Sequence, residues 1–150
     1  MQKYFLILLL IPFFVVTPGC SDGKLKTYPV SGIVTLNGEP VPGATVVFAP
    51  TKEGVGNDAT GITDEKGEYK LQTANGRVDG GTTPGEYSVI IKKESFVGTG
   101  KVTSDPSSGR TSEVMRQESL LPAKYGSYGS PQFKETVEAK KNVFNFNLED

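Results

Sequence analysis

Residues 30–48 have the sequence VSGIVTLNGEPVPGATVVF and introduce a pattern that recurs along the chain. The first expected strand covers residues 28–36 and places three apolar side chains on one face: Val30, Val34 and Leu36. The dipeptide Asn37-Gly38 follows, and it is the strongest short-range hairpin signal because both residues tolerate a positive φ. Residues 44–49 alternate again and form the second expected strand. This stretch therefore predicts a β-hairpin.

Alternating apolar and polar residues recur after this hairpin. Further strands are expected over residues 59–63, 68–73, 86–93, 133–139 and 143–148. Between the first two of them, Asp64 and Gly67 have the spacing of a type I turn, with an acceptor side chain at the first position and glycine at the last. No sustained helical periodicity is present after residue 27. The pattern predicts an all-β fold, an antiparallel sandwich of seven short strands.

Residues 94–119 differ from the strands on either side. Thirteen of these 26 residues are Ser, Thr, Gly or Pro, a composition that buries little apolar surface. A connection of this length is unusual inside a compact domain. We expect a mobile loop here, with a short helix near residues 112–118.

Three motifs in order carry a family resemblance: residues 30–48, the sequence ATGITDEKGEY over residues 59–69, and PGEYSV over residues 84–89. Together they resemble a carboxypeptidase regulatory-like domain, a transthyretin-like (prealbumin-like) β-sandwich. The sequence LPAKY over residues 121–125 is similar to a segment that precedes the last two strands in bacterial lipoprotein versions of this domain. The resemblance implies one domain over residues 28–150 and a non-catalytic structural or binding role.

The N-terminal residues 1–19 have the layout of a secretory signal peptide. Lys3 is the only charged residue before Asp22, and residues 4–16 are almost entirely apolar. The alternative is an uncleaved membrane anchor. Thirteen helical residues span about 20 Å, which is short of the ~30 Å hydrocarbon core, so a signal peptide is the better interpretation.

Cys20 is the only cysteine of the chain and directly follows Gly19 at the end of this segment. Gly19-Cys20 resembles the lipobox of bacterial lipoproteins, in which the cysteine thiol receives a diacylglycerol and the chain is cut before the cysteine. The resemblance implies lipidation of Cys20, with residues 20–27 as a tether to a membrane. Ser21, rather than Asp, after the cysteine is similar to lipoproteins sorted to the outer membrane. An ordinary secreted protein with a free thiol is the alternative.

Composition excludes several kinds of function. The 150 residues include no histidine, so neither a histidine base nor a histidine metal ligand is available. Sixteen Lys and Arg against 17 Asp and Glu give a net charge of −1, which disfavours nucleic-acid binding. No motif positions a nucleophile. We expect no enzymatic activity, no cofactor and no metal site.

Some side chains allow weaker hypotheses. Asp64 and Glu65 could be a metal-binding pair, but their turn spacing already explains them. Loop carboxylates could meet in a weak Ca²⁺ site, namely Asp58, Asp79 and Asp105. An aromatic platform for sugars could form from Tyr125, Tyr128 and Phe133, although core packing is the simpler role.

Two functions remain open at this point. The first is a lipid-anchored, extracytoplasmic structural or protein-interaction module of the cell envelope, with envelope proteins as partners. The second is a carbohydrate-binding module that uses the aromatic residues just named.

Overall fold

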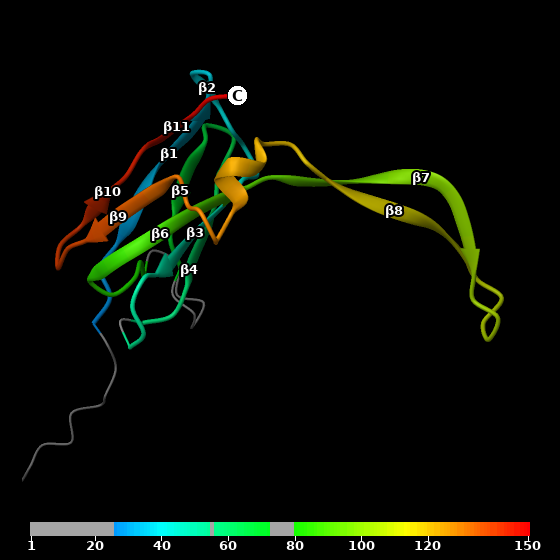
Figure 1. Cartoon of the computed structure of the whole chain (residues 1–150), viewed down its shortest axis with the longest axis horizontal. Coiled ribbons are helices and arrows are strands. Elements are labelled where there is room, and N and C mark those ends of the chain that lie inside the picture. Colours follow the sequence, from blue (N-terminus) through cyan, green and yellow to red (C-terminus); the bar gives the residue numbers. More distant parts are fainter. Residues whose placement is uncertain (1–25, 55, 73–79) are drawn as a thin grey trace, which may run out of the picture.

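The computed structural model of the chain describes residues 26–54, 56–72 and 80–150, and their regular structure is β-strand apart from one turn of 3-10 helix (Figure 1). The strands are β1 (Val30–Leu36), β2 (Glu39–Pro40), β3 (Thr45–Pro50), β4 (Ala59–Ile62), β5 (Glu68–Lys70), β6 (Gly85–Lys92), β7 (Glu94–Ser104), β8 (Thr111–Ser119), β9 (Phe133–Val137), β10 (Asn142–Val143) and β11 (Phe146–Leu148). The helical turn is η1 (Ala123–Gly126). The predicted all-β class is confirmed.

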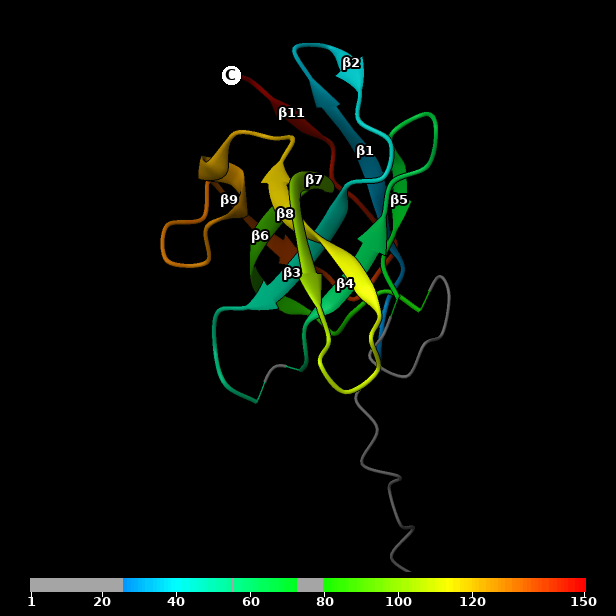
Figure 2. The ribbon, with the colours of Figure 1, turned by 90° about the vertical axis from the view of Figure 1, so that its right-hand side faces the viewer.

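Two sheets enclose the core (Figures 1 and 2). The first is built on β1, which pairs along one edge with β10 and β11 and along the other with β2 and β5. The second has the strand order β4-β3-β6-β9 and is antiparallel throughout. The contacts of β1 with β10 and β11 are parallel, so the expected antiparallel arrangement is wrong at this one edge. Parallel neighbours need a long connection, and here almost the whole domain supplies it.

The expectation of seven strands is also wrong, because the described residues form eleven. Pro40 is in β2, which returns directly from the first turn and pairs with the end of β1. The expected strand over residues 143–148 is split into β10 and β11. The remaining two additional strands lie in residues 94–119.

Both predicted turns are confirmed, but the hairpin expected between residues 28–36 and 44–49 is wrong, because β2 pairs with β1 and β3 lies in the other sheet. Asn37 and Gly38 have φ values of 52° and 88°, as a tight hairpin turn requires. At the second turn, Asp64 Oδ1 accepts hydrogen bonds from the amides of Lys66 and Glu68, each at 2.9 Å. Asp64 is therefore used as a turn residue, and the alternative of a metal-binding pair with Glu65 has no support in this geometry.

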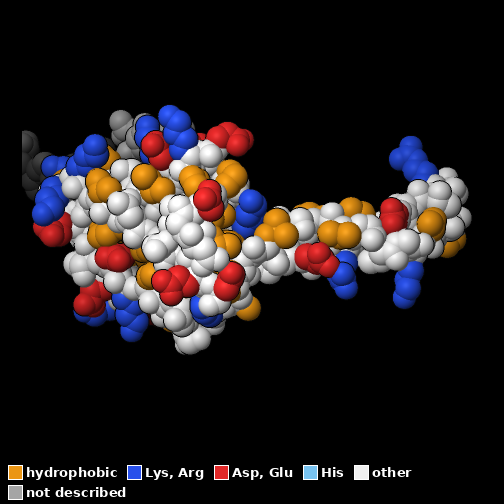
Figure 3. Space-filling view, turned by 90° about the horizontal axis from the view of Figure 1, so that it is seen from above, with side chains coloured by type: hydrophobic (Ala, Val, Ile, Leu, Met, Phe, Trp, Pro, Cys, Tyr) orange, Lys and Arg blue, Asp and Glu red, His pale blue; other side chains and the backbone are white. Residues whose placement is uncertain are grey.

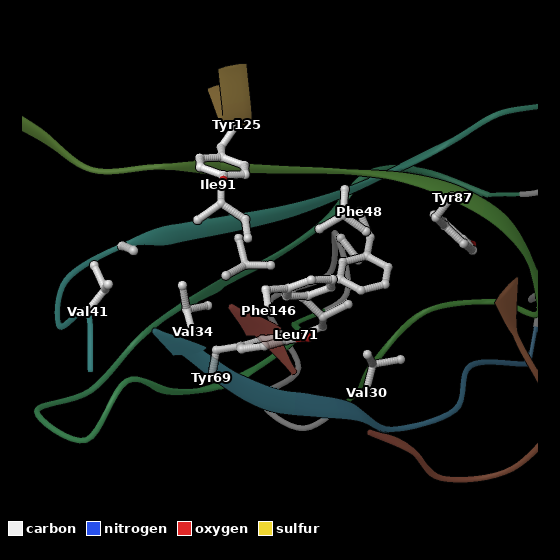
Figure 4. Close-up of a cluster of buried hydrophobic side chains, with 14 of the residues drawn as sticks. Val30, Val34, Val41, Phe48, Tyr69, Leu71, Tyr87, Ile91, Tyr125 and Phe146 are labelled. Atoms are coloured by element: carbon white, nitrogen blue, oxygen red, sulfur yellow. The ribbon is translucent and has the colours of Figure 1, made fainter. Parts of the chain in front are cut away.

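The core lies between the two sheets and is rich in aromatic rings (Figure 4). Phe146 of β11 is at its centre, with ring centroids 4.9 Å from Phe133, 6.2 Å from Tyr69 and 6.3 Å from Phe48. The buried residues are Val30, Val34, Val41, Ala44, Val46, Phe48, Ala59, Tyr69, Leu71, Tyr87, Val89, Ile91, Leu121, Tyr125, Val137, Phe146 and Leu148. Every one lies between residues 30 and 148, so a single hydrophobic core holds the domain together.

The C-terminal segment passes so close to β1 that Gly32 has no room for a side chain. An ideal Cβ at Gly32 would overlap the carbonyl oxygen of Phe144. The same oxygen accepts a hydrogen bond from Tyr69 Oη at 2.9 Å, and Asn145 Oδ1 accepts one from the amide of Ile33 at 3.0 Å. Residues 144 and 145, which connect β10 to β11, thus leave the ladder with β1. They remain hydrogen-bonded to residues of β1 and β5.

The buried phenol of Tyr69 makes stability sensitive to alkaline pH. Burial, and secondarily the charge of Glu135, raises the pKa of Tyr69 far above its ordinary value. The unfolded chain releases this proton above pH ~10, whereas the folded chain keeps it. The contribution of Tyr69 to the free energy of unfolding is therefore fully present below pH ~10. Above that pH it falls by about 1.4 kcal/mol per pH unit.

Urea unfolding of the chain and of a Tyr69→Phe variant between about pH 8 and pH 11 measures this effect. The variant should be less stable at pH ~8 by about 1 kcal/mol, because it lacks the hydrogen bond to Phe144. It should also lose less stability as the pH rises, since it has no phenol to ionise. Equal alkaline slopes for the two proteins would contradict the assignment.

Residues 94–119 form a long β-hairpin, which we call the arm; the expected mobile loop with a helix over residues 112–118 is wrong. The arm extends well beyond the two sheets (Figures 1 and 3). Its apolar side chains are exposed on both faces of the ribbon, because Phe96-Val97 and Val114-Met115 are neighbours along the strands. Residues 112, 113 and 115–118 instead pair across the hairpin with residues of β7.

Candidate functional site

The arm is the most distinctive surface of the molecule. It starts at the end of β6, where Glu94 pairs with Ser119, and runs to the pair Ser104 and Thr111. The ladder is interrupted between Gly98 and Val102, where β7 carries an irregularity. Figure 2 looks toward the arm and shows that its two strands stand in front of the sandwich without joining either sheet.

Asp105 organises the tip of the arm. Its carboxylate accepts hydrogen bonds from the Ser107 amide at 2.9 Å, from Ser107 Oγ at 2.7 Å and from Ser108 Oγ at 2.6 Å. These bonds, led by the one from Ser108, lower the pKa of Asp105 to about 2. Gly109, with a φ of 65°, completes the turn. The tip is polar, and the Asp105 carboxylate is used by the hydrogen bonds of the turn.

One face of the arm carries an apolar stripe. In a strand, alternate residues share a face, and residues paired across a ladder share it too. Phe96, opposite Gln117, therefore lies on the same face as Met115, opposite Gly98, and Val102, opposite Glu113. The three apolar side chains are 67%, 51% and 65% exposed. We call these three residues the stripe.

The stripe is unusual for a protein surface. A two-stranded ribbon on its own is marginally stable in water, because neither face is covered. Contiguous exposed apolar side chains commonly mark a surface that binds something. The sequence does not predict the stripe, because Phe96-Val97 and Val114-Met115 place apolar side chains on both faces and leave no period-2 alternation. The stripe becomes apparent only from the cross-strand register.

The weaker hypothesis of a Ca²⁺ site at Asp58, Asp79 and Asp105 has no support in the residues described. Asp105 lies at the far tip of the arm and Asp58 in the sandwich, so the two carboxylates do not converge (Figure 1). Asp79 lies outside the described residues. Within residues 26–54, 56–72 and 80–150, no three metal-ligating side chains come together.

The aromatic platform is likewise not assembled. Tyr125, on η1, is a core residue whose ring stacks on Phe133 with centroids 5.6 Å apart. Its hydroxyl donates to the carbonyl of Glu149 at 3.0 Å and accepts from the amide of the same residue at 2.8 Å. Tyr128 alone is exposed, with Lys92 Nζ 5.0 Å from its ring centroid. Core packing is therefore the role of Tyr125 and, in part, of Phe133.

A groove of about 520 Å³ lies over β1, β5 and β10. Its apolar lining comes from Ile33, Ile62 and Val143, which are all exposed. Charges of both signs border it, from Asp64, Glu68 and Lys70. This mixed lining indicates no particular reaction, and the groove is a second surface with exposed apolar side chains.

Cys20, Ser21 and the expected signal peptide lie outside the described residues. Of the residues that are described, none belongs to a helix with the length and hydrophobicity to cross a membrane. The expected lipid anchor is thus a matter for experiment.

No family model matches the chain, and no curated protein matches it. Among solved structures, it is similar to a 9R-lipoxygenase from Cyanothece PCC8801, with a TM-score of 0.37 and 10% sequence identity. The alignment covers 83% of this chain and 16% of the lipoxygenase chain, so this chain spans only a small part of that protein. Similarity at this level carries no argument about activity, and the function has to be inferred from the geometry above.

Proposed function

We propose that this protein is a lipid-anchored, extracytoplasmic β-sandwich that acts as a non-catalytic interaction module of the cell envelope. The observation that carries the proposal is the arm, which presents the stripe away from the sandwich. The residues described hold no cluster of ligating side chains that would support a metal-dependent reaction. A surface for binding is what the geometry offers.

The proposed fold family is the transthyretin-like, carboxypeptidase regulatory-like sandwich. Three features support it, each at the place where the sequence motifs predict it. Asn37-Gly38 turns between β1 and β2, Asp64 and Gly67 turn between β4 and β5, and Gly85 opens β6. The arm is then an insertion between the third motif and the last strands.

The first described residues lie at the end of the sandwich away from the arm, an arrangement compatible with the proposed anchor on Cys20. Tyr28 pairs with Thr82, three residues before the start of β6, while the arm leaves from the opposite end of β6. The eight residues of β6 separate these points by about 26 Å. A lipid attached at residue 20 would hold one end of the sandwich near a membrane, in our proposal the outer membrane, and the arm would leave from the far end.

The anchor and the arm are tested together in cells that produce the chain. Mass spectrometry of the N-terminal peptide should show a diacylglyceryl group on Cys20, and a Cys20→Ser variant should leave the membrane fraction. A peptide that starts elsewhere, or a free thiol on membrane-bound protein, contradicts the anchor.

In the same cells, a variant with residues 95–118 replaced by Asn-Gly should stay in the membrane fraction but lose any complex larger than one chain on native gels. The matched control replaces only the polar tip, residues 105–110, by Asn-Gly and keeps the stripe, so it should retain the complex. Identical complexes in all three proteins would remove the arm from the proposed function.

A further inference from the structure

We infer that the free edge of β8 binds an extended segment of another protein, which pairs with it as a third strand of the arm. This inference rests on the proposed function, in which the arm is the interaction element. It names the part of the arm that binds and the kind of segment that it binds.

The hydrogen bonds of the arm show which backbone groups of β8 point away from β7. The carbonyls of Ser112 and Val114 accept hydrogen bonds from threonine side chains of β7, at 3.4 Å and 2.8 Å. Just after β8, the amide of Leu120 donates to the carbonyl of Lys93 at 2.8 Å. Successive residues of a strand turn their backbone groups to opposite sides, so the even-numbered residues of β8 face β7. The residues whose amide and carbonyl point to the open side are therefore Glu113, Met115 and Gln117.

This open side has no strand beside it among the residues described, because β8 pairs only with β7. A row of unpaired amides and carbonyls is a template for a further strand. Backbone pairing at a sheet edge is also a recurrent way in which proteins bind extended peptides. A third strand would moreover stabilise the arm, since a two-stranded ribbon alone is marginal in water.

Two other edges of the molecule carry features that prevent such pairing, and β8 lacks them. Proteins protect exposed edges with lysine, proline, bulges or charges on the inward face. The edge strand β9 has Lys134, and it has Glu135 on the face that packs toward the core. The strand β7 is interrupted between Gly98 and Val102 and carries Lys101 there. The nine residues of β8 include neither lysine nor proline.

The charged side chains of β8 do not oppose a third strand, because each is bound within the arm. Glu113 Oε1 accepts the amide of Gly100 at 2.8 Å, and its carboxylate lies over Gly98 of β7. Arg116 forms an ion pair with Glu118 of the same strand. The middle of the free edge therefore offers backbone groups and apolar side chains.

These apolar side chains indicate the chemistry of the partner segment. Val114 and Met115 are consecutive, so they lie on opposite faces of the arm, where they are 38% and 51% exposed. Residues that lie opposite each other across a ladder share a face and contact each other. A segment that pairs with this part of β8 therefore needs two consecutive apolar residues, one for each face.

Fluorescence polarisation with the purified full chain tests this edge. The probe is a labelled synthetic peptide of about eight residues, in which Thr and Lys alternate on either side of a central Val-Ile pair. It should bind with a Kd of about 10–100 µM. It should not bind the variant in which Asn-Gly replaces residues 95–118. An unchanged polarisation with the parent chain overturns the inference.

Two substitutions at Gln117 separate backbone pairing from side-chain contact. Gln117→Pro removes an amide that faces the open side and none that faces β7, so the arm keeps its own hydrogen bonds. This variant should bind the probe at least about tenfold more weakly than the parent chain. Gln117→Ala keeps the amide and should bind within about twofold of the parent. Equal binding of the probe by the two variants overturns the edge pairing.

A second comparison leaves the protein unchanged and modifies the probe. N-methylation of alternate residues removes the amide donors along one edge of the peptide, and the two possible alternations give two methylated probes. Only one edge of a bound peptide faces β8, so one methylated probe should lose at least about tenfold in affinity. Full binding of both methylated probes overturns the edge pairing.

The Gln117 variants also distinguish this inference from the proposed function in the producing cells. The complex on native gels should be lost with Gln117→Pro, be retained with Gln117→Ala, and contain a second protein. If the arm deletion removes the complex and Gln117→Pro retains it, the arm binds through a face. In that case this inference fails and the proposed function stands. A complex that contains only copies of this chain overturns the choice of partner, and the Cys20 result is independent of these tests.

Discussion

A Gly32→Ala variant is expected to lose about 2–6 kcal/mol of unfolding free energy. The added methyl group would overlap the Phe144 carbonyl oxygen, which has to move away from β1. That movement also breaks the hydrogen bond from Tyr69 Oη and leaves a buried hydroxyl without its acceptor. Overpacking costs about 1–3 kcal/mol and an unsatisfied buried group about the same again. A loss of this size is a large part of the ~5–15 kcal/mol that stabilises a typical domain.

Urea unfolding monitored by circular dichroism measures this loss. Gly129→Ala is the matched control, because a Cβ at residue 129 has no neighbour within 4 Å. Its unfolding free energy should stay within about 0.5 kcal/mol of the parent. If the two alanine variants unfold at the same urea concentration, the close approach of Phe144 to β1 is not a feature of the folded protein.

The second large effect is expected for Phe146→Ala. Truncation removes a ring that contacts three others, Phe48, Tyr69 and Phe133, and leaves a cavity between the two sheets. Phenylalanine-to-alanine changes in a core cost about 3–5 kcal/mol, and the centre of this core gives little room for collapse.

Phe96→Ala is the control for this change, since it makes the same substitution on the exposed face of the arm. At low protein concentration it should leave the unfolding free energy within about 0.5 kcal/mol of the parent. Comparable losses in the two variants would mean that the arm packs on the sandwich, which contradicts the arrangement described.

Much of the sandwich could be predicted from the sequence, because local chemistry decides it. Asn37-Gly38 and Asp64 to Gly67 impose their turns through φ preference and side-chain acceptors, with no help from the rest of the fold. Alternation likewise predicts the inward side of β6, with Tyr87, Val89 and Ile91 all buried. These features need only neighbours in sequence.

The errors arise where distant segments decide the outcome. Nothing local in residues 143–148 indicates that they bind β1 in parallel, or that Gly32 lets Phe144 and Asn145 leave the ladder. The arm is not predicted for a different reason: its strands are consecutive, but residues 94–119 show no apolar and polar alternation. For the candidate site, the sequence predicts Cys20, which lies outside the described residues. The stripe, in contrast, can be identified only from the cross-strand register of β7 and β8.

The pairing of β1 with β11 also has a consequence for folding kinetics. Val34 is in register with Phe146, a separation of 112 residues, so the two strands cannot meet until nearly the whole chain is available. Folds dominated by such non-local contacts fold slowly, in about milliseconds to seconds. During synthesis, β1 is made before this neighbour and stays without it until residues 146–148 appear. The chain is therefore expected to stay unfolded, and able to pass through a narrow channel, until β11 has been made. The core between the two sheets is complete only when β11 is in place.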